Sequence, residues 1–169
     1  MGELLNRRRL ETANRIKQIR ETLIDAEKLC GSTACVYMTG SFSRGEASGH
    51  SDLDLFIVSR DSDSKPGLRR LDEILIKADL IETTRKLRIP DFSGDGEYLT
   101  HYTVADLTGT LGKPEDDVSN TFTARLLMLL ESLPLLGSAA YRDVIEDVIT
   151  AYWRDYEDHK TDFMPTPCQ

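Results

Sequence analysis

The sequence predicts a single α/β or α+β domain built on a small mixed β-sheet that helices flank. Two observations support this fold class. Short apolar segments of strand length are interspersed with longer segments in which apolar residues recur every three or four positions. Their order is helix, strand, strand, helix, strand and then helices, without an internal repeat. A chain of 169 residues with 40% hydrophobic content is long enough to bury one core.

The first three elements surround a glycine-rich bend. The first helix is predicted from Glu3 to Leu29, where apolar residues recur at helical spacing, and Gly31 stands at the position of a helix-terminating glycine. The apolar run from Ala34 to Met38 predicts a buried strand. The segment Ser41 to Ser51 is rich in small residues and leads to a second predicted strand, Leu53 to Val58. The bend therefore connects the end of one strand to the start of the next.

A second helix is predicted to begin near Pro66 and to continue to about Leu87, crossing back over the sheet. Its apolar face is expected to consist of Leu68, Leu71, Ile74, Leu75, Ala78 and Ile81. Glu97 to Thr103 predicts a third strand or an extended connection. Thr121 to Ser132 and Ala139 to Tyr156 are predicted helices, and the leucine run in the first of them is expected to be buried.

These elements divide the chain into three parts. Residues 1–110 are expected to form the core that carries the site, residues 111–160 a C-terminal helical segment packed on that core, and residues 161–169 a tail. The tail contains two prolines and no helix cap, so it is expected to be frayed or to mark a point of truncation.

Composition excludes several classes of function. Lys and Arg number 21 against 29 Asp and Glu, and the net charge of −8 makes generic DNA binding unfavourable. A single nucleotide is still allowed, because a bound divalent cation reverses the local field. Three cysteines without paired spacing predict neither a disulfide framework nor a zinc site. The sequence has no apolar run of signal-peptide or membrane-span length, so we expect a cytoplasmic protein without contact with a membrane.

Asp52 and Asp54 are the strongest candidates for a functional site. They stand one residue apart at the start of an apolar segment, and on a strand such residues project to the same face, about 6–7 Å apart. Two carboxylates on one face suit Mg²⁺, which completes its coordination with water and phosphate oxygens. Acidic pairs are also common in surface turns, so the pair alone does not establish a metal site.

The turn Gly40-Ser41-Phe42-Ser43-Arg44-Gly45 strengthens this hypothesis. It follows a predicted strand, and its hydroxyls and exposed backbone N–H groups could hold phosphate oxygens without obstruction by side chains. Ser43 and Arg44 are candidate phosphate contacts, the latter through its planar set of donors. The alternative for Arg44 is an ion pair with Glu46 or exposure to solvent.

The combined pattern resembles the signature of the DNA polymerase β-like nucleotidyltransferase superfamily. The shared features are a strand that ends in Gly-Ser, a linker of ten residues and Asp-Leu-Asp in an apolar strand, and they cover Val36 to Val58. The resemblance implies that Gly40 and Ser41 bind a nucleoside triphosphate and that Asp52 and Asp54 bind Mg²⁺ or Mn²⁺. It also implies transfer of a nucleoside monophosphate from this NTP to a hydroxyl acceptor, with release of pyrophosphate.

The resemblance further implies a third carboxylate on a later strand. The acidic residues near the third predicted strand are Asp91, Asp95 and Glu97. Glu97 is favoured because it stands beside Tyr98 and Leu99 on that strand. The other two lie among turn-forming residues, and Asp95 is the second choice. Both Glu97 and Asp95 could instead be structural.

The acceptor is left open by the sequence. A small molecule, a protein side chain, a nucleotide and an RNA end all fit the same core, because parts outside the signature choose the acceptor. The chain is expected to be a fragment of a longer protein, or a minimal transferase that works with a protein partner, as in the toxin–antitoxin nucleotidyltransferases that it resembles. The competing hypothesis is a catalytically silent nucleotide-binding or protein-interaction module that has lost the third carboxylate.

Overall fold

The computed structural model describes residues 2–61, 67–93 and 99–161. Its sheet consists of the strands β1 (Ala34–Met38), β2 (Leu55–Ser59), β3 (His101–Thr103) and β4 (Leu133–Leu136), in the spatial order β3-β2-β1-β4. β1 pairs antiparallel with β2 and β4, and β2 pairs parallel with β3. This mixed sheet, flanked by helices, confirms the predicted fold class.

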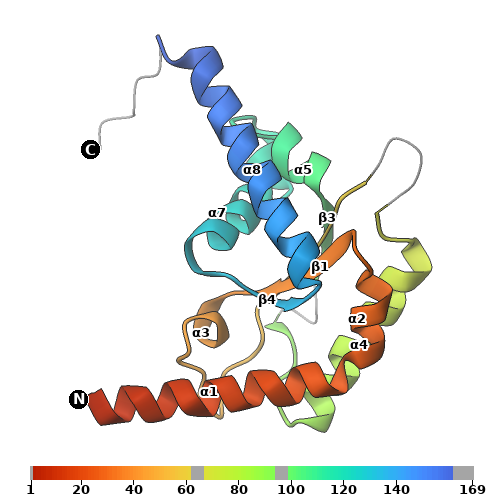
Figure 1. The fold of residues 1–169 in the computed structure, drawn as a ribbon, viewed down its shortest axis with the longest axis vertical. Coiled ribbons are helices and arrows are strands. Elements are labelled where there is room, and N and C mark those ends of the chain that lie inside the picture. The colour runs from red at the N-terminus through yellow and green to blue at the C-terminus, as the bar shows by residue number, and fades with distance from the viewer. Residues whose placement is uncertain (1, 62–66, 94–98, 162–169) are drawn as a thin grey trace.

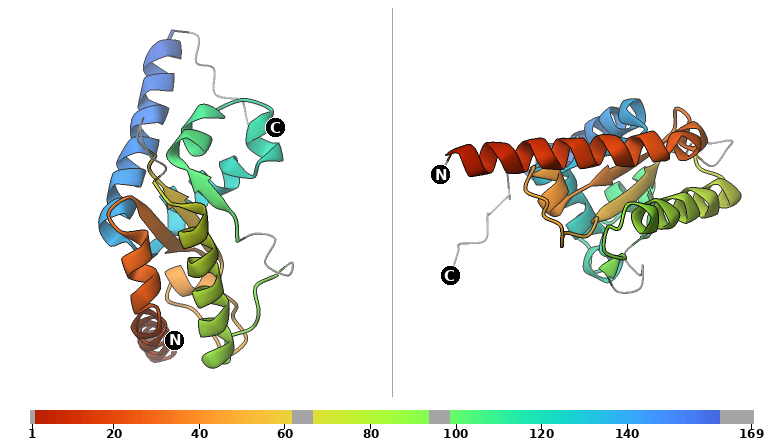
Figure 2. Two further views of the ribbon diagram at one scale, coloured as in Figure 1. Left: turned by 90° about the vertical axis from the view of Figure 1, so that its right-hand side faces the viewer. Right: turned by 90° about the horizontal axis from the view of Figure 1, so that it is seen from below.

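Helices cover both faces of the sheet (Figures 1 and 2). One face carries α1 (Gly2–Thr22), α2 (Ile24–Cys30) and α4 (Arg70–Lys86). The other carries α5 (Val104–Gly109), α7 (Thr121–Glu131) and α8 (Ser138–His159). Two single-turn helices, α3 (Gly40–Ser43) and α6 (Glu115–Val118), lie in the connections. None of the helices in the described ranges is long and apolar enough to cross a membrane.

β1 is the central strand, and all five of its residues are fully buried. Successive side chains of a strand point to opposite faces. Ala34, Val36 and Met38 therefore join the core under α1, α2 and α4, and Cys35 and Tyr37 join the core under α7 and α8. The strand predicted from this apolar run is confirmed, and both of its faces are covered.

The first helix is not continuous, which corrects the prediction of one helix from Glu3 to Leu29. α1 ends at Thr22 and α2 begins at Ile24, and the chain bends sharply between them (Figure 1). Leu23, at the break, is fully buried with φ −96° and ψ 27°. The bend turns α2 along the sheet, so that Leu23 and Ala26 both reach the core.

Most of the apolar face predicted for the second long helix is wrong, although Leu68, which precedes the start of α4 at Arg70, is buried as predicted. Leu71, Ile74 and Leu75 of α4 are 72%, 48% and 51% exposed. The residues that α4 buries are Glu73, Ile76, Leu80, Thr83 and Thr84. The carboxylate of Glu73 can be buried because Lys77 donates a hydrogen bond to it at 2.6 Å. The side of α4 that faces the core is therefore the one that carries the paired Glu73, and the leucines at helical spacing lie on the exposed side.

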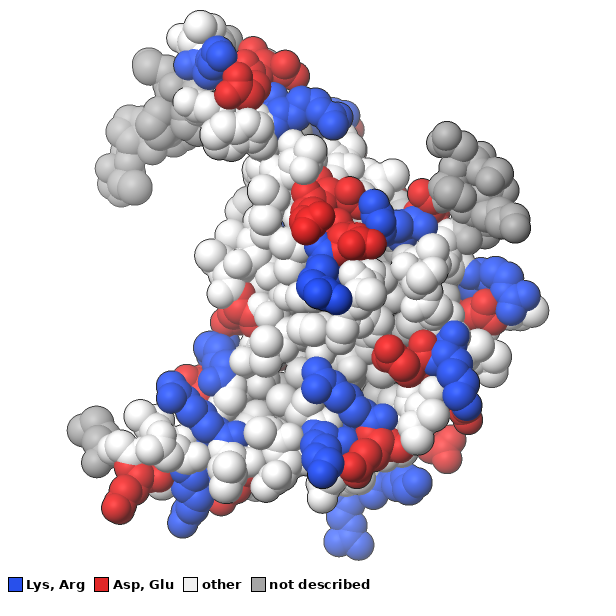
Figure 3. Space-filling view, in the orientation of Figure 1, with Lys and Arg blue, Asp and Glu red and all other residues white. Residues whose placement is uncertain are grey.

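The leucine run of α7 is also not buried as expected. Leu126, Leu129 and Leu130 are exposed, whereas Arg125 and Met128 on another side of the helix are buried. Figure 3 shows that the side of the molecule where α7 lies is hollowed and carries few charged side chains. The helix lies at the surface, with one side on the core.

Several element bounds differ from the predictions. The second strand begins at Leu55, so the Asp pair precedes it. β4 was not predicted, because it is short and contains Pro134, and it lies at an edge of the sheet. Of the third predicted strand only His101–Thr103 is a described strand, and the tail beyond residue 161 lies outside the described residues.

A buried ion pair ties the C-terminal helices together. Arg125 is 1% exposed, and its guanidinium donates to both carboxylate oxygens of Asp116. It also donates to the carbonyl oxygen of Leu107 in α5 (2.7 Å) and to the hydroxyl of Tyr152 in α8 (3.0 Å). Burial alone raises the pKa of Asp116, but hydrogen bonds from Arg125 and Thr121 outweigh it and hold that pKa below its ordinary value.

We predict that Arg125→Met lowers the free energy of unfolding by about 3–5 kcal/mol, because it leaves the Asp116 carboxylate buried without its partner. Urea denaturation at pH 7 measures the loss. Arg142→Met, which removes an exposed arginine from α8, is the control and should change the free energy by less than about 0.5 kcal/mol. Equal stability of the two variants would contradict this account of the ion pair.

Candidate functional site

The glycine turn and the Asp pair meet where β1 ends and β2 begins. The backbone N–H of Thr39 donates to the carbonyl oxygen of Asp54 at 2.9 Å, which extends the pairing of the two strands by one residue. Leu53 is buried, whereas Asp52 is half-buried and Asp54 is exposed. The alternation expected of the pair therefore holds, although the two aspartates stand just before the strand.

Gly40 allows the carboxylate of Asp54 to approach the backbone. Its φ is +65°, and a Cβ at this position would lie 2.5 Å from Oδ2 of Asp54. A side chain would thus meet both a strained backbone conformation and a carboxylate oxygen. Glycine is therefore required here for two reasons: the backbone has a positive φ, and a side chain would collide with Asp54.

Glu131, at the end of α7, is a site residue that sequence reasoning missed. Its Oε1 accepts a hydrogen bond from the backbone N–H of Gly40 (3.2 Å), and its Oε2 accepts one from Nη1 of Arg44 (2.6 Å). Arg44 also donates to Glu46 at 3.0 Å, so the ion pair considered as the alternative for this arginine is formed. Glu131 is the single acid in the helix predicted from Thr121 to Ser132, and no local pattern links it to the glycine turn.

The charges around Asp54 are mostly negative. Partial burial, Asp52 and Glu131 all raise the pKa of Asp54, in that order, and Arg44 opposes them. The hydrogen bond from Arg44 lowers the pKa of Glu131, and the N–H of Gly40 contributes. A bound cation would relieve the repulsion at Asp54, so the carboxylate oxygens present are chemically suited to a hard divalent ion. In the part of the chain that the structure describes, no group of three or more acids, histidines or cysteines is arranged to hold a metal ion.

A cavity of about 420 Å³ opens beside Asp54. It is lined by Thr39, Gly40, Asp54, Leu55, Phe56, Ser93, Asn120, Thr123, Leu127 and Glu131. Its polar groups come from the glycine turn, Asp54 and α7, and apolar side chains form part of its wall. This volume and this mixed lining fall in the range of small-ligand sites.

The remaining predicted site residues are the two serines of the glycine turn and the three candidates for a third carboxylate. Ser41 is half-buried beside Gly40, and the hydroxyl of Ser43 donates back to the carbonyl oxygen of Gly40 at 2.9 Å. Asp91 is exposed and pairs with Arg85 at 3.6 Å. Asp95 and Glu97 lie outside the described residues.

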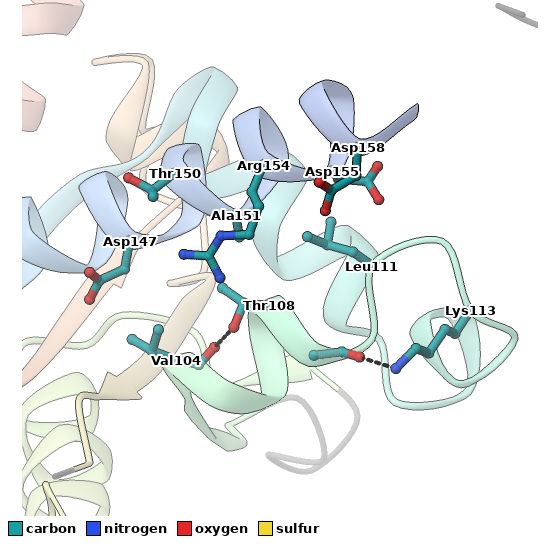
Figure 4. Close-up of a pocket in the computed structure, with 11 residues that line it drawn as sticks. Val104, Thr108, Leu111, Lys113, Asp147, Thr150, Ala151, Arg154, Asp155 and Asp158 are labelled. Atoms are coloured by element: carbon teal, nitrogen blue, oxygen red, sulfur yellow. Dashed lines mark hydrogen bonds between the residues drawn. The ribbon is translucent and has the colours of Figure 1, made fainter. Parts of the chain in front are cut away.

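A larger cavity of about 640 Å³ lies between α5 and α8. Figure 4 shows Asp155 and Asp158 on one side of it, and Lys113 directed at the carbonyl oxygen of Gly109, to which it donates at 2.7 Å. Arg154 and Asp147 also line it. Because none of the predicted site residues lines this cavity, we assign the candidate site to the smaller one.

Comparisons with known proteins agree with the motif. Residues 16–98, just under half of the chain, match the family model of the nucleotidyltransferase domain, and this span contains Gly40, Ser41 and both aspartates. The predicted resemblance is thereby confirmed. A chain from a crystal structure described as a toxin–antitoxin with AMP-PNP is similar at 13% identity and a TM-score of 0.43, over 86% of this chain and 93% of that one. No curated protein matches the sequence.

We predict that Gly40→Ala destabilises the fold more than Gly112→Ala does. Both glycines have positive φ, +65° and +67°, so both variants should lose about 1 kcal/mol from backbone strain. Around Gly112 nothing lies within 4 Å of an added Cβ, whereas at Gly40 the carboxylate of Asp54 must also move. Urea denaturation of the two variants isolates this contact, and equal losses would show that Asp54 does not press on the turn.

We also predict that Asp54→Asn stabilises the protein at neutral pH. A raised pKa in the folded state means that the contribution of Asp54 to stability is present below the ordinary aspartate pKa and is lost as the pH rises through the raised value. The variant should therefore melt at a higher temperature than wild type at pH 7 in EDTA, and this advantage should vanish at pH 3. Asp25→Asn, at an exposed position on α2, is the control. A lower melting temperature for Asp54→Asn at pH 7 would contradict the prediction.

Proposed function

Because residues 16–98 match the nucleotidyltransferase domain family, we propose that this protein transfers a nucleoside monophosphate from an NTP such as ATP to a hydroxyl acceptor, with release of pyrophosphate. The observation that carries the proposal is the convergence at one cavity of anion-binding donors and of a metal-suited acid. Gly40 and Asp54 line the cavity and supply a backbone donor and the carboxylate. Arg44 donates to Glu131, which also lines the cavity, and Asp52 lies beside Asp54.

The glycine turn is proposed to hold the triphosphate. The N–H of Gly40 and the guanidinium of Arg44 already bind a carboxylate, so their directions suit the oxygens of an anion. Ser41 would add its hydroxyl. Ser43 holds the turn through its hydrogen bond to the carbonyl oxygen of Gly40, which is the role we assign to it.

Asp52 and Asp54 are proposed to hold Mg²⁺ or Mn²⁺. Divalent ions there would stabilise charge on the attacking and leaving oxygens of a displacement at the α-phosphorus. The residues themselves position the reactants: the close approach of Asp54 to Gly40 keeps the metal-binding acid next to the phosphate-binding turn. Phe56 and Leu127 contribute apolar side chains to the wall of the cavity, which would limit the access of water to a bound nucleotide.

Glu97 is proposed as the third carboxylate, with Asp95 as the second choice. The described residues before and after this segment support the proposal. Ser93 lines it, and β3 runs parallel beside β2, the strand that follows Asp54.

A nucleotide-binding module without transfer activity is the second candidate. It is favoured by the observation that the described residues gather no third acid suited to a metal around the pair. The acceptor of an active enzyme would be a small molecule, a protein side chain or an RNA end, and a protein partner could contribute to its selection.

We predict that the double variant Asp52→Asn, Asp54→Asn loses magnesium-dependent ATP binding by at least about tenfold, because both proposed metal ligands become neutral. Isothermal titration calorimetry with ATP, GTP, CTP and UTP, each with and without Mg²⁺, measures the change. Asp25→Asn is the matched control, since it removes an exposed acid from α2. Unchanged binding by the double variant would refute the assignment of the site.

Pyrophosphate release across a panel of acceptors then separates the two candidate functions. An active enzyme releases pyrophosphate, and Glu97→Gln should abolish the release without abolishing ATP binding, whereas Asp95→Asn should retain both. Binding of ATP without release for any acceptor, including the cell's own proteins and RNA, would favour the silent module.

A further inference from the structure

The carboxylate of Glu131 lies in the anion-binding part of the candidate site. It accepts hydrogen bonds from the N–H of Gly40 (3.2 Å) and from Arg44 (2.6 Å), the two donors to which we assign the triphosphate. The protein therefore places one of its own anions where a phosphate oxygen is expected.

The fold holds Glu131 at this place. α7 ends at Glu131, and β4 begins two residues later, with Leu133 paired to Met38 at the end of β1. The glycine turn starts directly beyond β1. The antiparallel pairing of β4 with β1 thus brings the end of α7 next to the turn, although Gly40 and Glu131 are 91 residues apart in the chain.

We infer that Glu131 is an internal competitor of the nucleotide, whose carboxylate occupies the phosphate position of the glycine turn until a triphosphate displaces it. This inference rests on the proposed function and adds a means of selecting the ligand. A phosphate that enters the site is repelled by the negative charge of Glu131, and the N–H of Gly40 already donates its hydrogen bond to that carboxylate. A ligand with several phosphates and a divalent cation gains enough new contacts to displace the carboxylate, and inorganic phosphate or a nucleoside monophosphate gains fewer.

The geometry favours this role over that of a metal ligand. Each carboxylate oxygen of Glu131 accepts from an N–H group, and the carboxylate would have to give up these hydrogen bonds to coordinate a cation. Displacement is feasible because the side chains of Glu131 and Arg44 are 24% and 45% exposed, and ion pairs at that exposure are weak.

The test uses the full chain and inorganic tripolyphosphate without metal as the probe. Glu131→Gln keeps the shape of the side chain and removes its charge, and Glu131→Ala removes the competitor altogether. Both variants are expected to bind tripolyphosphate about tenfold more tightly than wild type by calorimetry. The reason is that no internal carboxylate then competes with the phosphate for the N–H of Gly40 and for Arg44. Glu46→Gln, which removes the other carboxylate partner of Arg44 but leaves Gly40 unchanged, should alter the affinity less than about threefold.

Each outcome decides the inference. Tighter binding by both Glu131 variants, with unchanged circular dichroism, supports it. Unchanged or weaker binding of tripolyphosphate overturns it, and a loss of magnesium-dependent ATP affinity in Glu131→Gln would assign Glu131 to the metal instead. If wild type binds ATP with magnesium in an Asp52- and Asp54-dependent manner while the Glu131 variants show no gain, the inference alone fails. If neither wild type nor the variants bind ATP or tripolyphosphate, the proposed function fails with it.

Discussion

The burial of β1 on both faces is the constraint on which the rest of this structure depends. Its five residues are inaccessible to solvent, with alternate side chains in two separate cores, and its backbone pairs with a strand on each side. A strand in this position needs helices on both faces and hydrogen-bonding partners at both edges. The N-terminal helices and α4 cover one face, and the C-terminal helices cover the other. The helical segment after residue 110 is therefore part of the layer that completes the core.

The candidate site arises at the end of this strand. β1 ends at Met38, the chain turns at Gly40 after the buried Thr39, and it returns as β2 directly after Asp54. β4, on the other side of β1, brings the end of α7 to the same place, and the buried pair of Arg125 with Asp116 holds α7 against α5, α6 and α8. The glycine turn, the start of β2 and α7 thus line one cavity because each adjoins β1 or a strand paired with it.

The charges around Asp54 in the candidate site are unfavourable for stability. Asp52 and Glu131 raise the pKa of Asp54, so the ionised carboxylate is held among like charges at neutral pH. The donors of the glycine turn are satisfied by carboxylates: the N–H of Gly40 donates to Glu131, and the guanidinium of Arg44 donates to Glu131 and to Glu46. An acid suited to a cation and donors suited to an anion lie side by side, which is the arrangement that a metal-bound phosphate requires. Functional sites often retain such unfavourable local charges because the ligand relieves them.

Local sequence determined the features that depend on near neighbours. The apolar run of β1, the glycine turn that follows it, and the alternation that exposes Asp54 and buries Leu53 were all predictable from residues close together in the chain. These features also define the nucleotidyltransferase motif, and the domain match confirmed the resemblance.

Only the tertiary structure decided what depends on distant partners. Periodicity assigned Leu71 and the leucines of α7 to the core, yet the core took Glu73 and Arg125, whose charges are matched by Lys77 and Asp116. The break at Leu23 and the edge strand β4 likewise follow from packing against the sheet. Glu131 reaches the glycine turn only through the pairing of β4 with β1, across 91 residues of chain. Hydrophobic spacing records which residues are apolar, but the free energy of burial depends on which partners the fold brings together.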